Sequence, residues 1–297
     1  MKISFLVLAH NNFIHLQRLL DALQDPDVHF YIHFDKKSNI DIGDFEREDV
    51  TVLSDRIDVH WGGFSIVEAT MKLLNAAYPS NSDFYLLLSG THYPVRSNAY
   101  IKKFLLEHHD HNFITVLRMP HNSKPLSRLE NFFIEGGIRP SKPGIRPIII
   151  SAINYAIKKS GYKRRLPAAY SNYELYAGSQ WWGFNHSFVA YLIEFLRNNR
   201  DFVNFYRHTL IPDEMFFHTI IMNSPFRNTV RNTFHYADWS IGKPPYPSLI
   251  EDIHLPILAR ETFSNDPYGE HELLFARKFD DHSSAIIKKI EEFRRSR

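Results

Sequence analysis

The feature that most constrains the fold is a strand, helix and strand pattern at the start of the chain. Residues Ile3 to Ala9 form an uninterrupted apolar run, which predicts a buried strand. Leucines at helical spacing follow: Leu16, Leu19, Leu20 and Leu23. Residues Val28 to Asp35 predict a second strand. This order opens a parallel α/β sheet, so we expect a mostly parallel central sheet flanked by helices.

Later segments extend this sheet and define one functional edge. Three further strands are predicted at residues 50–53, 84–88 and 113–117, with a helix at 66–77. Ligands of such sheets bind at the carboxyl ends of the strands. His10, Asp35 and the stretch Ser89 to Tyr93 all fall at those ends.

Composition excludes several classes of protein. A net charge of +2 over 297 residues argues against a nucleic-acid binder. The chain has no cysteine and therefore no disulfide and no thiol nucleophile. The lack of disulfides fits a reducing compartment. We find no signal-peptide cleavage pattern and no apolar run of about 18 residues, so we expect neither a leader nor a membrane span. Dinucleotide, P-loop and Gly-x-Ser-x-Gly motifs are missing as well.

The stretch from Leu210 to Met222 contains the clearest candidate for a catalytic group. Pro212 fits the first turn of a helix, where the helix dipole also favours Asp213 and Glu214. Apolar residues then recur at helical spacing and predict one buried face: Phe217, Ile220 and Ile221. A carboxylate at a rigid helix start suits a general base. The alternative is that both acids simply favour a first turn.

Cations near the C-terminus suggest an anion site. Arg277 and Lys278 stand among apolar residues, where an unpaired charge is costly, and Arg260 lies a short distance upstream. Cations in such places often bind a diphosphate. Structural pairing with nearby acids is an equally open alternative, the candidates being Glu270, Asp280 and Asp281. A nucleotide-sugar transferase without a metal needs such cations, together with a base such as Glu214.

Metal-binding patterns are weak. The 17 histidines include no His-Glu-x-x-His pattern, and His108, His109 and His111 share a polar loop. The triplet Asp25-Pro26-Asp27 precedes a strand, whereas a metal–nucleotide carboxylate pair would follow one. We therefore expect no metal site.

Residues of about 118–176 form an irregular basic and aromatic insertion. Repeated prolines predict that no long element forms from Arg118 to about Pro167. An apolar segment, Ile148 to Ile157, is followed by the basic run Lys158 to Arg165. Such an insertion can lie on an acidic membrane surface or contact an acceptor. A solvated excursion that caps the core is the alternative.

Seven separated stretches, in order, resemble the core-2/I-branching β-1,6-N-acetylglucosaminyltransferases and the related peptide O-xylosyltransferases. They cover the chain from residue 3 to about 280. The stretches are Leu8-Ala9-His10, residues 31–38, residues 59–65, residues 88–94, Gly178-Ser179-Gln180-Trp181-Trp182, Pro212-Asp213-Glu214 and residues 275–279.

The resemblance implies a single GT-A-type domain over residues 1–297, an inverting mechanism, a UDP-sugar donor and no divalent metal or other cofactor. It implies that Glu214 activates the acceptor hydroxyl. Other matched positions would bind the two substrates. Lys278 and Arg260 would clamp the diphosphate, Asp35 and His10 would hold the uridine with Arg56 nearby, and Trp181, Trp182 and Tyr93 would contact the acceptor. For at least one tryptophan, a core position is the alternative.

Two departures from the family refine these expectations. His92 stands where the family often carries an acid. The vertebrate branching enzymes are Cys-rich and membrane-anchored, whereas this chain has no cysteine and we expect no anchor. It therefore looks like a bacterial-type relative. We expect it to act in the cytoplasm, with peripheral membrane contact through Lys158 to Arg165 left open, on a glycan or glycolipid acceptor.

Several alternatives remain open at this point. N-acetylglucosamine is the first expectation for the transferred sugar, with UDP-xylose or UDP-glucuronate as alternative donors. A non-catalytic glycan-binding relative and a metal-dependent hydrolase built on the histidines are the rival functions. The acceptor's identity and the oligomeric state have no sequence signal.

Overall fold

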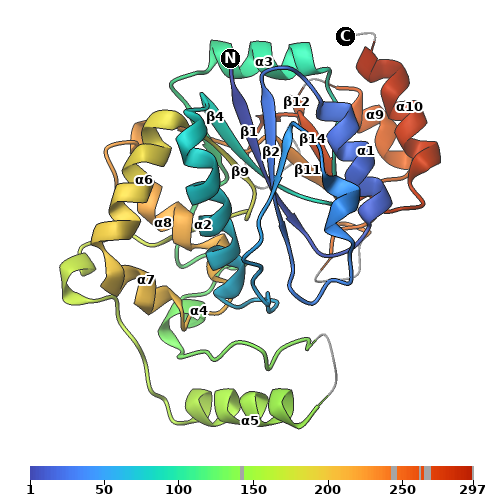
Figure 1. Cartoon of the computed structure of the whole chain (residues 1–297). Helices are drawn as coiled ribbons and strands as arrows, with labels where there is room; N and C mark the ends of the chain where they lie inside the picture. Colours follow the sequence, from blue (N-terminus) through green and yellow to red (C-terminus); the bar gives the residue numbers. More distant parts are fainter. Residues whose placement is uncertain (141–143, 242–245, 261, 264–268, 296–297) are drawn as a thin grey trace.

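The computed structural model describes residues 1–140, 144–241, 246–260, 262–263 and 269–295. Its centre is a seven-stranded sheet of order β10-β6-β9-β4-β1-β2-β3 (Figure 1). Only the pairings made by β9 are antiparallel, and the other four are parallel. The strands are β1 (Ile3–Ala9), β2 (Val28–Phe34), β3 (Val50–Val52), β4 (Phe84–Ser89), β6 (Asn112–Ile114), β9 (Trp182–Asn185) and β10 (Val230–Arg231). The predicted mostly parallel α/β sheet is confirmed.

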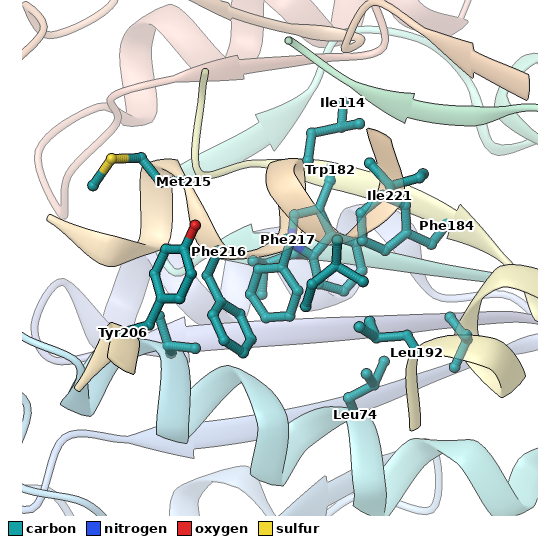
Figure 2. Close-up of a cluster of buried hydrophobic side chains, with 14 of the residues drawn as sticks. Leu74, Ile114, Trp182, Phe184, Leu192, Tyr206, Met215, Phe216, Phe217 and Ile221 are labelled. Atoms are coloured by element: carbon teal, nitrogen blue, oxygen red, sulfur yellow. The ribbon is translucent and has the colours of Figure 1, made fainter. Parts of the chain in front are cut away.

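Helices cover both faces of this sheet, and β1 shows why. Its alternate side chains Phe5 and Val7 join one apolar cluster, whereas Leu6 and Leu8 join another. The first cluster includes the predicted leucines of α1, and the second packs against α2, α6 and α8. Figure 2 shows the second cluster around Trp182. The helices are α1 (Phe13–Leu23), α2 (Ser65–Ala77), α3 (Asn98–Glu107), α6 (His186–Asn198), α7 (Arg200–Tyr206) and α8 (Phe216–Met222).

A smaller sheet of order β11-β14-β5 carries the candidate cations Arg277 and Lys278 at one strand end. Its strands are β11 (His235–Ala237), β14 (Phe275–Arg277) and β5 (His92–Pro94), and α10 (Ser284–Arg295) packs beside it. In this register Arg277 pairs with His92 on one side and Ala237 on the other. Lys278 therefore leaves the sheet at the end of β14.

The region at 118–176 differs from its prediction. The expectation that prolines prevent a long element there is wrong, because α5 (Ile145–Lys159) runs for 15 residues. Pro147 lies in its first turn, where the missing N–H has no intrahelical partner to lose. In Figure 1, α5 stands apart from the helices that cover the sheet. Short elements flank it: β7 (Leu117–Arg118), α4 (Ser127–Glu130), η3 (Ala168–Tyr170) and β8 (Tyr176–Ala177).

Short elements complete the architecture. They are η1 (Ile42–Phe45), η2 (Tyr78–Ser80), η4 (Pro212–Glu214), η5 (Arg227–Thr229), η6 (Asp252–His254), α9 (Leu255–Leu258), β12 (Thr262–Phe263) and β13 (His271–Glu272). In the described ranges, no helix combines the length and apolar character needed to cross a bilayer.

Candidate active site

Glu214 lies in a short turn that precedes a buried helix. The prediction of one helix starting at Pro212 is wrong in detail, because a 3-10 turn ends at Glu214 and Met215 leaves helical geometry with φ of −138°. Helix α8 begins only at Phe216 and is buried on almost every side, not on one face. The turn is thus fixed by a hydrophobic helix behind it, which holds the carboxylate at the edge of the core.

Two cations hold one oxygen of Glu214. Its Oε2 accepts hydrogen bonds from Lys124 Nζ at 2.5 Å and from Arg128 NH1 at 2.6 Å, and both contacts are ion pairs. Oε1 accepts no hydrogen bond from any described residue, and 26% of the side chain is exposed. One oxygen therefore positions the carboxylate, and the other is available to a ligand.

Asp213 has a different role from its neighbour. Its Oδ1 is buried and has no hydrogen-bond partner among the described residues. Burial raises the pKa of Asp213, and the adjacent Glu214 carboxylate raises it further. Of the two acids in this turn, Glu214 is the one with paired cations and an accessible oxygen.

A single loop connects Glu214 to the cations of the smaller sheet. The Gly178 N–H donates to the Glu214 carbonyl at 2.8 Å, and the Gly178 carbonyl accepts from Lys124 Nζ at 3.1 Å. Three residues later, the Trp181 ring lies 4.7 Å from the Arg277 guanidinium carbon. Three peptide steps span at most about 11 Å between Cα atoms, so one short loop contacts both the turn of Glu214 and the Arg277 side chain.

Arg277 and Lys278 are neighbouring cations without an acidic partner in the described part of the chain. Burial lowers the pKa of Arg277 to about 10, and its Nε is buried without a hydrogen-bond partner. Burial, with the Arg277 charge, lowers the pKa of Lys278 to about 8, and Lys278 Nζ lies 4.5 Å from the Tyr246 ring centre. Neither cation forms an ion pair with any of the candidate acids, Glu270, Asp280 or Asp281, in the described part of the chain. Two cations that are costly to bury and lack an acidic partner suit the binding of an anion.

Histidines, not acids, surround the Arg277 guanidinium. His92 and His235 are buried, and their ring centres lie 5.0 Å apart. The His92 ring also meets Trp181 edge-on at 4.7 Å. Burial lowers the pKa of His92 and of His235 well below the usual value, and the Arg277 charge lowers both further. These rings therefore leave the Arg277 charge uncompensated.

His10 and Asp35 come together at the carboxyl ends of β1 and β2, as expected for that edge. Asp35 Oδ1 accepts from the Lys37 backbone N–H at 2.9 Å and pairs with Lys37 Nζ at 3.1 Å. Its Oδ2 makes no hydrogen bond with the described residues. Desolvation by the surrounding residues lowers the pKa of His10, the Asp35 charge opposes this effect, and the Lys278 charge adds to it. The three groups therefore share one neighbourhood.

The side chains of Arg56 and Arg260 are not directed at a common site with Lys278 by any described contact. Arg56 donates to the backbone carbonyls of Phe34, Asp35 and Ser38, at 3.2, 2.5 and 2.7 Å. It therefore shapes the loop that carries Asp35. Arg260 follows α9 as an exposed side chain, and no described contact brings it to Lys278.

The two tryptophans fall in different environments, and Tyr93 points elsewhere. Trp181 is 7% exposed and lies beside Arg277, whereas Trp182 is fully buried between Phe184 and Phe217 (Figure 2). The Tyr93 hydroxyl donates to Glu291 of α10 at 3.0 Å. Trp182 thus has no surface on which a sugar can stack, and Tyr93 is directed to the helix behind the smaller sheet.

Replacing Trp182 with Ala is expected to lower the free energy of unfolding by about 3–5 kcal/mol, because it empties a fully buried site. Urea denaturation of the wild type and Trp182→Ala measures this change. The prediction is wrong if Trp182→Ala keeps wild-type stability and instead loses substrate binding.

No three His, Asp or Glu side chains gather as a possible metal site in the described part of the chain. His108 and His111 are in ring contact at 5.5 Å, but no third ligand joins them. Metal independence remains a prediction.

Sequence reasoning missed Lys124 and Arg128. Both lie in the region that matched no recognised pattern, and they reach Glu214 across 90 and 86 residues of chain. A weak signal was present, since an acid at the edge of a core needs cationic partners, but nothing local identified them.

The site therefore contains a carboxylate, an unpaired cation pair and a polar strand edge on an α/β frame. A family model described as "Core-2/I-Branching enzyme" matches residues 3–256. The chain belongs to the core-2/I-branching enzyme family, and its α/β architecture is of the GT-A type of glycosyltransferases.

Individual relatives are more distant. The chain is 30% identical to mouse xylosyltransferase 2 over an alignment 325 positions long, which covers 98% of this chain and 33% of that protein. It is 28% identical to rat xylosyltransferase 1 over 255 residues, covering 80% of this chain and 28% of that protein. The corresponding figures for human xylosyltransferase 1 are 28% over 253 residues, 80% and 24%. The chain thus spans a third or less of the length of these relatives.

Proposed function

We propose that this chain is an inverting, metal-independent glycosyltransferase that moves a sugar from a UDP-sugar to an acceptor hydroxyl. The observation that carries the proposal is the loop from Gly178 to Trp181. At one end it binds the turn of Glu214, and at the other it packs on the unpaired cation Arg277. Glycosyl transfer needs a base for the acceptor hydroxyl and a positive charge for the departing diphosphate, and this loop contacts a candidate for each.

The reaction follows from these positions. Glu214 takes the acceptor proton on Oε1 as the acceptor oxygen forms a bond to the anomeric carbon. The bond from that carbon to the diphosphate oxygen breaks on the opposite face, so the configuration inverts. UDP leaves with the bonding electron pair, and Arg277 and Lys278 stabilise its charge. Arg260 is a further candidate for this role.

The uridine would lie at the carboxyl ends of β1 and β2. Asp35 Oδ2 is the accepting atom available there, and His10 lines the same edge. Arg56 contributes by holding the loop backbone from Asp35 to Ser38, since its donors already bind those carbonyls. Trp181 remains the aromatic candidate for a sugar face.

The transferred sugar has two leading candidates. N-acetylglucosamine follows from the branching enzymes, and xylose from the relatives named xylosyltransferases. The acceptor is a hydroxyl of a glycan or glycolipid. An unpaired Glu214 Oε1 argues for turnover over a purely glycan-binding role, because binding alone does not require a positioned base.

UDP release from a panel of UDP-sugars, with and without EDTA, tests this proposal. We expect slow hydrolysis of one donor at a rate that EDTA leaves unchanged. Loss of activity in EDTA, with recovery on adding a divalent metal, would refute metal independence and favour a hydrolase or metal-dependent transferase.

The pKa of Lys278 predicts a pH dependence of UDP binding. Lys278 is charged below about pH 8 and loses its charge as the pH rises above that value. The Kd for UDP should therefore be nearly constant up to pH 7, about double by pH 8 and then rise further, approaching tenfold per pH unit. In Lys278→Arg the rise should be much smaller up to about pH 9.5, because arginine keeps its charge there. Identical profiles for the two proteins would exclude Lys278 from the site.

A further inference from the structure

Helix α5 has a fixed orientation against the rest of the chain. The Asn154 side chain accepts from the Ile134 N–H at 2.9 Å and donates to the Ile134 carbonyl at 2.8 Å. Ser151 Oγ donates to the Gly137 carbonyl at 2.6 Å. These bonds fix one side of the helix on the segment before it, so the opposite side faces away from the protein.

The outward side is apolar and exposed. It carries four isoleucines, Ile145, Ile148, Ile149 and Ile153, which are 76%, 69%, 51% and 41% exposed. Ala152 and Ala156 fill the spaces between them and are exposed as well. No described residue covers this side, so burial against the protein's own core does not explain its composition.

The stretch of chain that carries this helix has charged residues of a single sign. Residues 136–173 contain eight Lys or Arg and no Asp or Glu. Arg146, Lys158 and Arg165 make no ion pair with any described residue, and Lys159 only faces the Tyr155 ring at 5.6 Å. Within the described chain, these cations are available to an external anionic surface.

Two members of the basic run at 158–165 are not available in this way. Arg164 turns inward and donates to the carbonyls of Leu129 and Phe205, both at 2.8 Å. Lys163 pairs with Glu130 at 3.3 Å. The interacting surface is therefore the outward side of α5 together with the cations at the two ends of the helix and just beyond it, which are Arg146, Lys158, Lys159 and Arg165.

We propose that this surface docks the protein on a membrane that carries anionic lipids. An apolar helix side between cations fits the interface of such a bilayer, where isoleucines enter the headgroup boundary and cations meet lipid phosphates. A second copy of the chain is a poor partner, because it would bring two strongly cationic surfaces together. An acidic soluble protein would satisfy the charges but gives no reason for the exposed isoleucines.

The position of α5 links docking to the active site. Its supporting segment begins with Arg128, which binds Glu214, and continues to Arg139, which lies 4.1 Å from the Trp61 ring and 5.5 Å from the Tyr246 ring. Tyr246 is also the ring that faces Lys278. Docking would thus set the proposed site beside the bilayer. If the chain is a glycosyltransferase, as proposed above, this position favours a lipid-linked acceptor.

Vesicle co-sedimentation tests the docking. The wild-type protein should sediment with vesicles of phosphatidylcholine plus phosphatidylglycerol and remain in solution with phosphatidylcholine alone. Ile148→Glu, and the double variant Lys158→Glu/Arg165→Glu, should each weaken partition about tenfold or more.

Matched controls come from surfaces away from α5. Leu106→Glu changes a 61% exposed apolar residue of α3, and Lys103→Glu/Lys288→Glu reverses two exposed cations. Both controls should partition within about twofold of wild type, and all variants should keep wild-type UDP affinity and circular dichroism. These two measurements separate the two proposals. If only docking is wrong, the proteins bind UDP but the variants do not differ in partition. If the proposed function is wrong, no protein binds UDP, the wild type included.

Three results would overturn the docking proposal. One is wild-type protein that stays in solution with the anionic vesicles. Another is an equal loss of partition in the α3 control. The third is self-association in vesicle-free ultracentrifugation that Ile148→Glu reverses, which would assign this surface to a second copy of the chain.

Discussion

Glu214→Gln is expected to lower kcat by about 10³-fold, within the 10²–10⁴ that a general base contributes. The amide keeps the shape of the side chain but cannot take the acceptor proton. It also cannot form the ion pairs that Glu214 Oε2 makes with Lys124 and Arg128. Initial rates of sugar transfer at saturating donor and acceptor measure the effect.

Glu174→Gln is the matched control for this variant. Glu174 is likewise a partly exposed glutamate between two arginines, Arg118 and Arg227, at 2.7 and 2.9 Å. Its replacement should change kcat by no more than about twofold, because it lies outside the proposed site. Full activity in Glu214→Gln, or an equal loss in both variants, would remove Glu214 from the role of base.

Arg277→Met and Lys278→Met are expected to lower kcat/KM by about 10²-fold or more each. Both remove a charge that stabilises the departing diphosphate, a contribution of a few kcal/mol per donor. Removing Arg277 also leaves the Trp181 ring without its cation. Steady-state kinetics with varied donor concentration measures the effect, together with UDP affinity.

Arg118→Met serves as the control for these cation variants. Arg118 is 70% exposed and pairs with Glu174, so its loss should leave kcat/KM within about twofold of wild type. If Arg277→Met and Lys278→Met bind UDP as tightly as wild type does, the diphosphate lies elsewhere.

The sheet could be predicted from sequence because its strands are buried on both faces. Such strands form continuous apolar runs, and β1 is buried at all seven positions. The short edge strands β3 and β10 carry weaker signals, since they are only partly buried. The leucines of α1 were equally legible, because one buried stripe produces helical spacing.

Which of the two adjacent tryptophans is buried could not be predicted from the sequence. Successive residues near a strand point to opposite faces, so one of Trp181 and Trp182 was bound to enter the core. Composition cannot say which, since either ring can be buried. The register of β9 decides it by placing Trp182 against Phe184 and Phe217.

The partners of Glu214 were beyond prediction for another reason. Lys124 and Arg128 belong to a segment whose position depends on the loop before α8, not on any local pattern. For α5, the sequence showed the apolar segment Ile148 to Ile157 but not that it forms a helix whose apolar side stays exposed.

The most direct test of the account is a calorimetric titration of UDP, UMP and uridine in the presence of EDTA. If Arg277 and Lys278 bind the diphosphate without a metal, UDP should bind at least about tenfold more tightly than UMP, and UMP more tightly than uridine. Added magnesium should leave the order and the UDP affinity unchanged. Equal affinities for the three ligands, or UDP binding that appears only with magnesium, would contradict the proposed site.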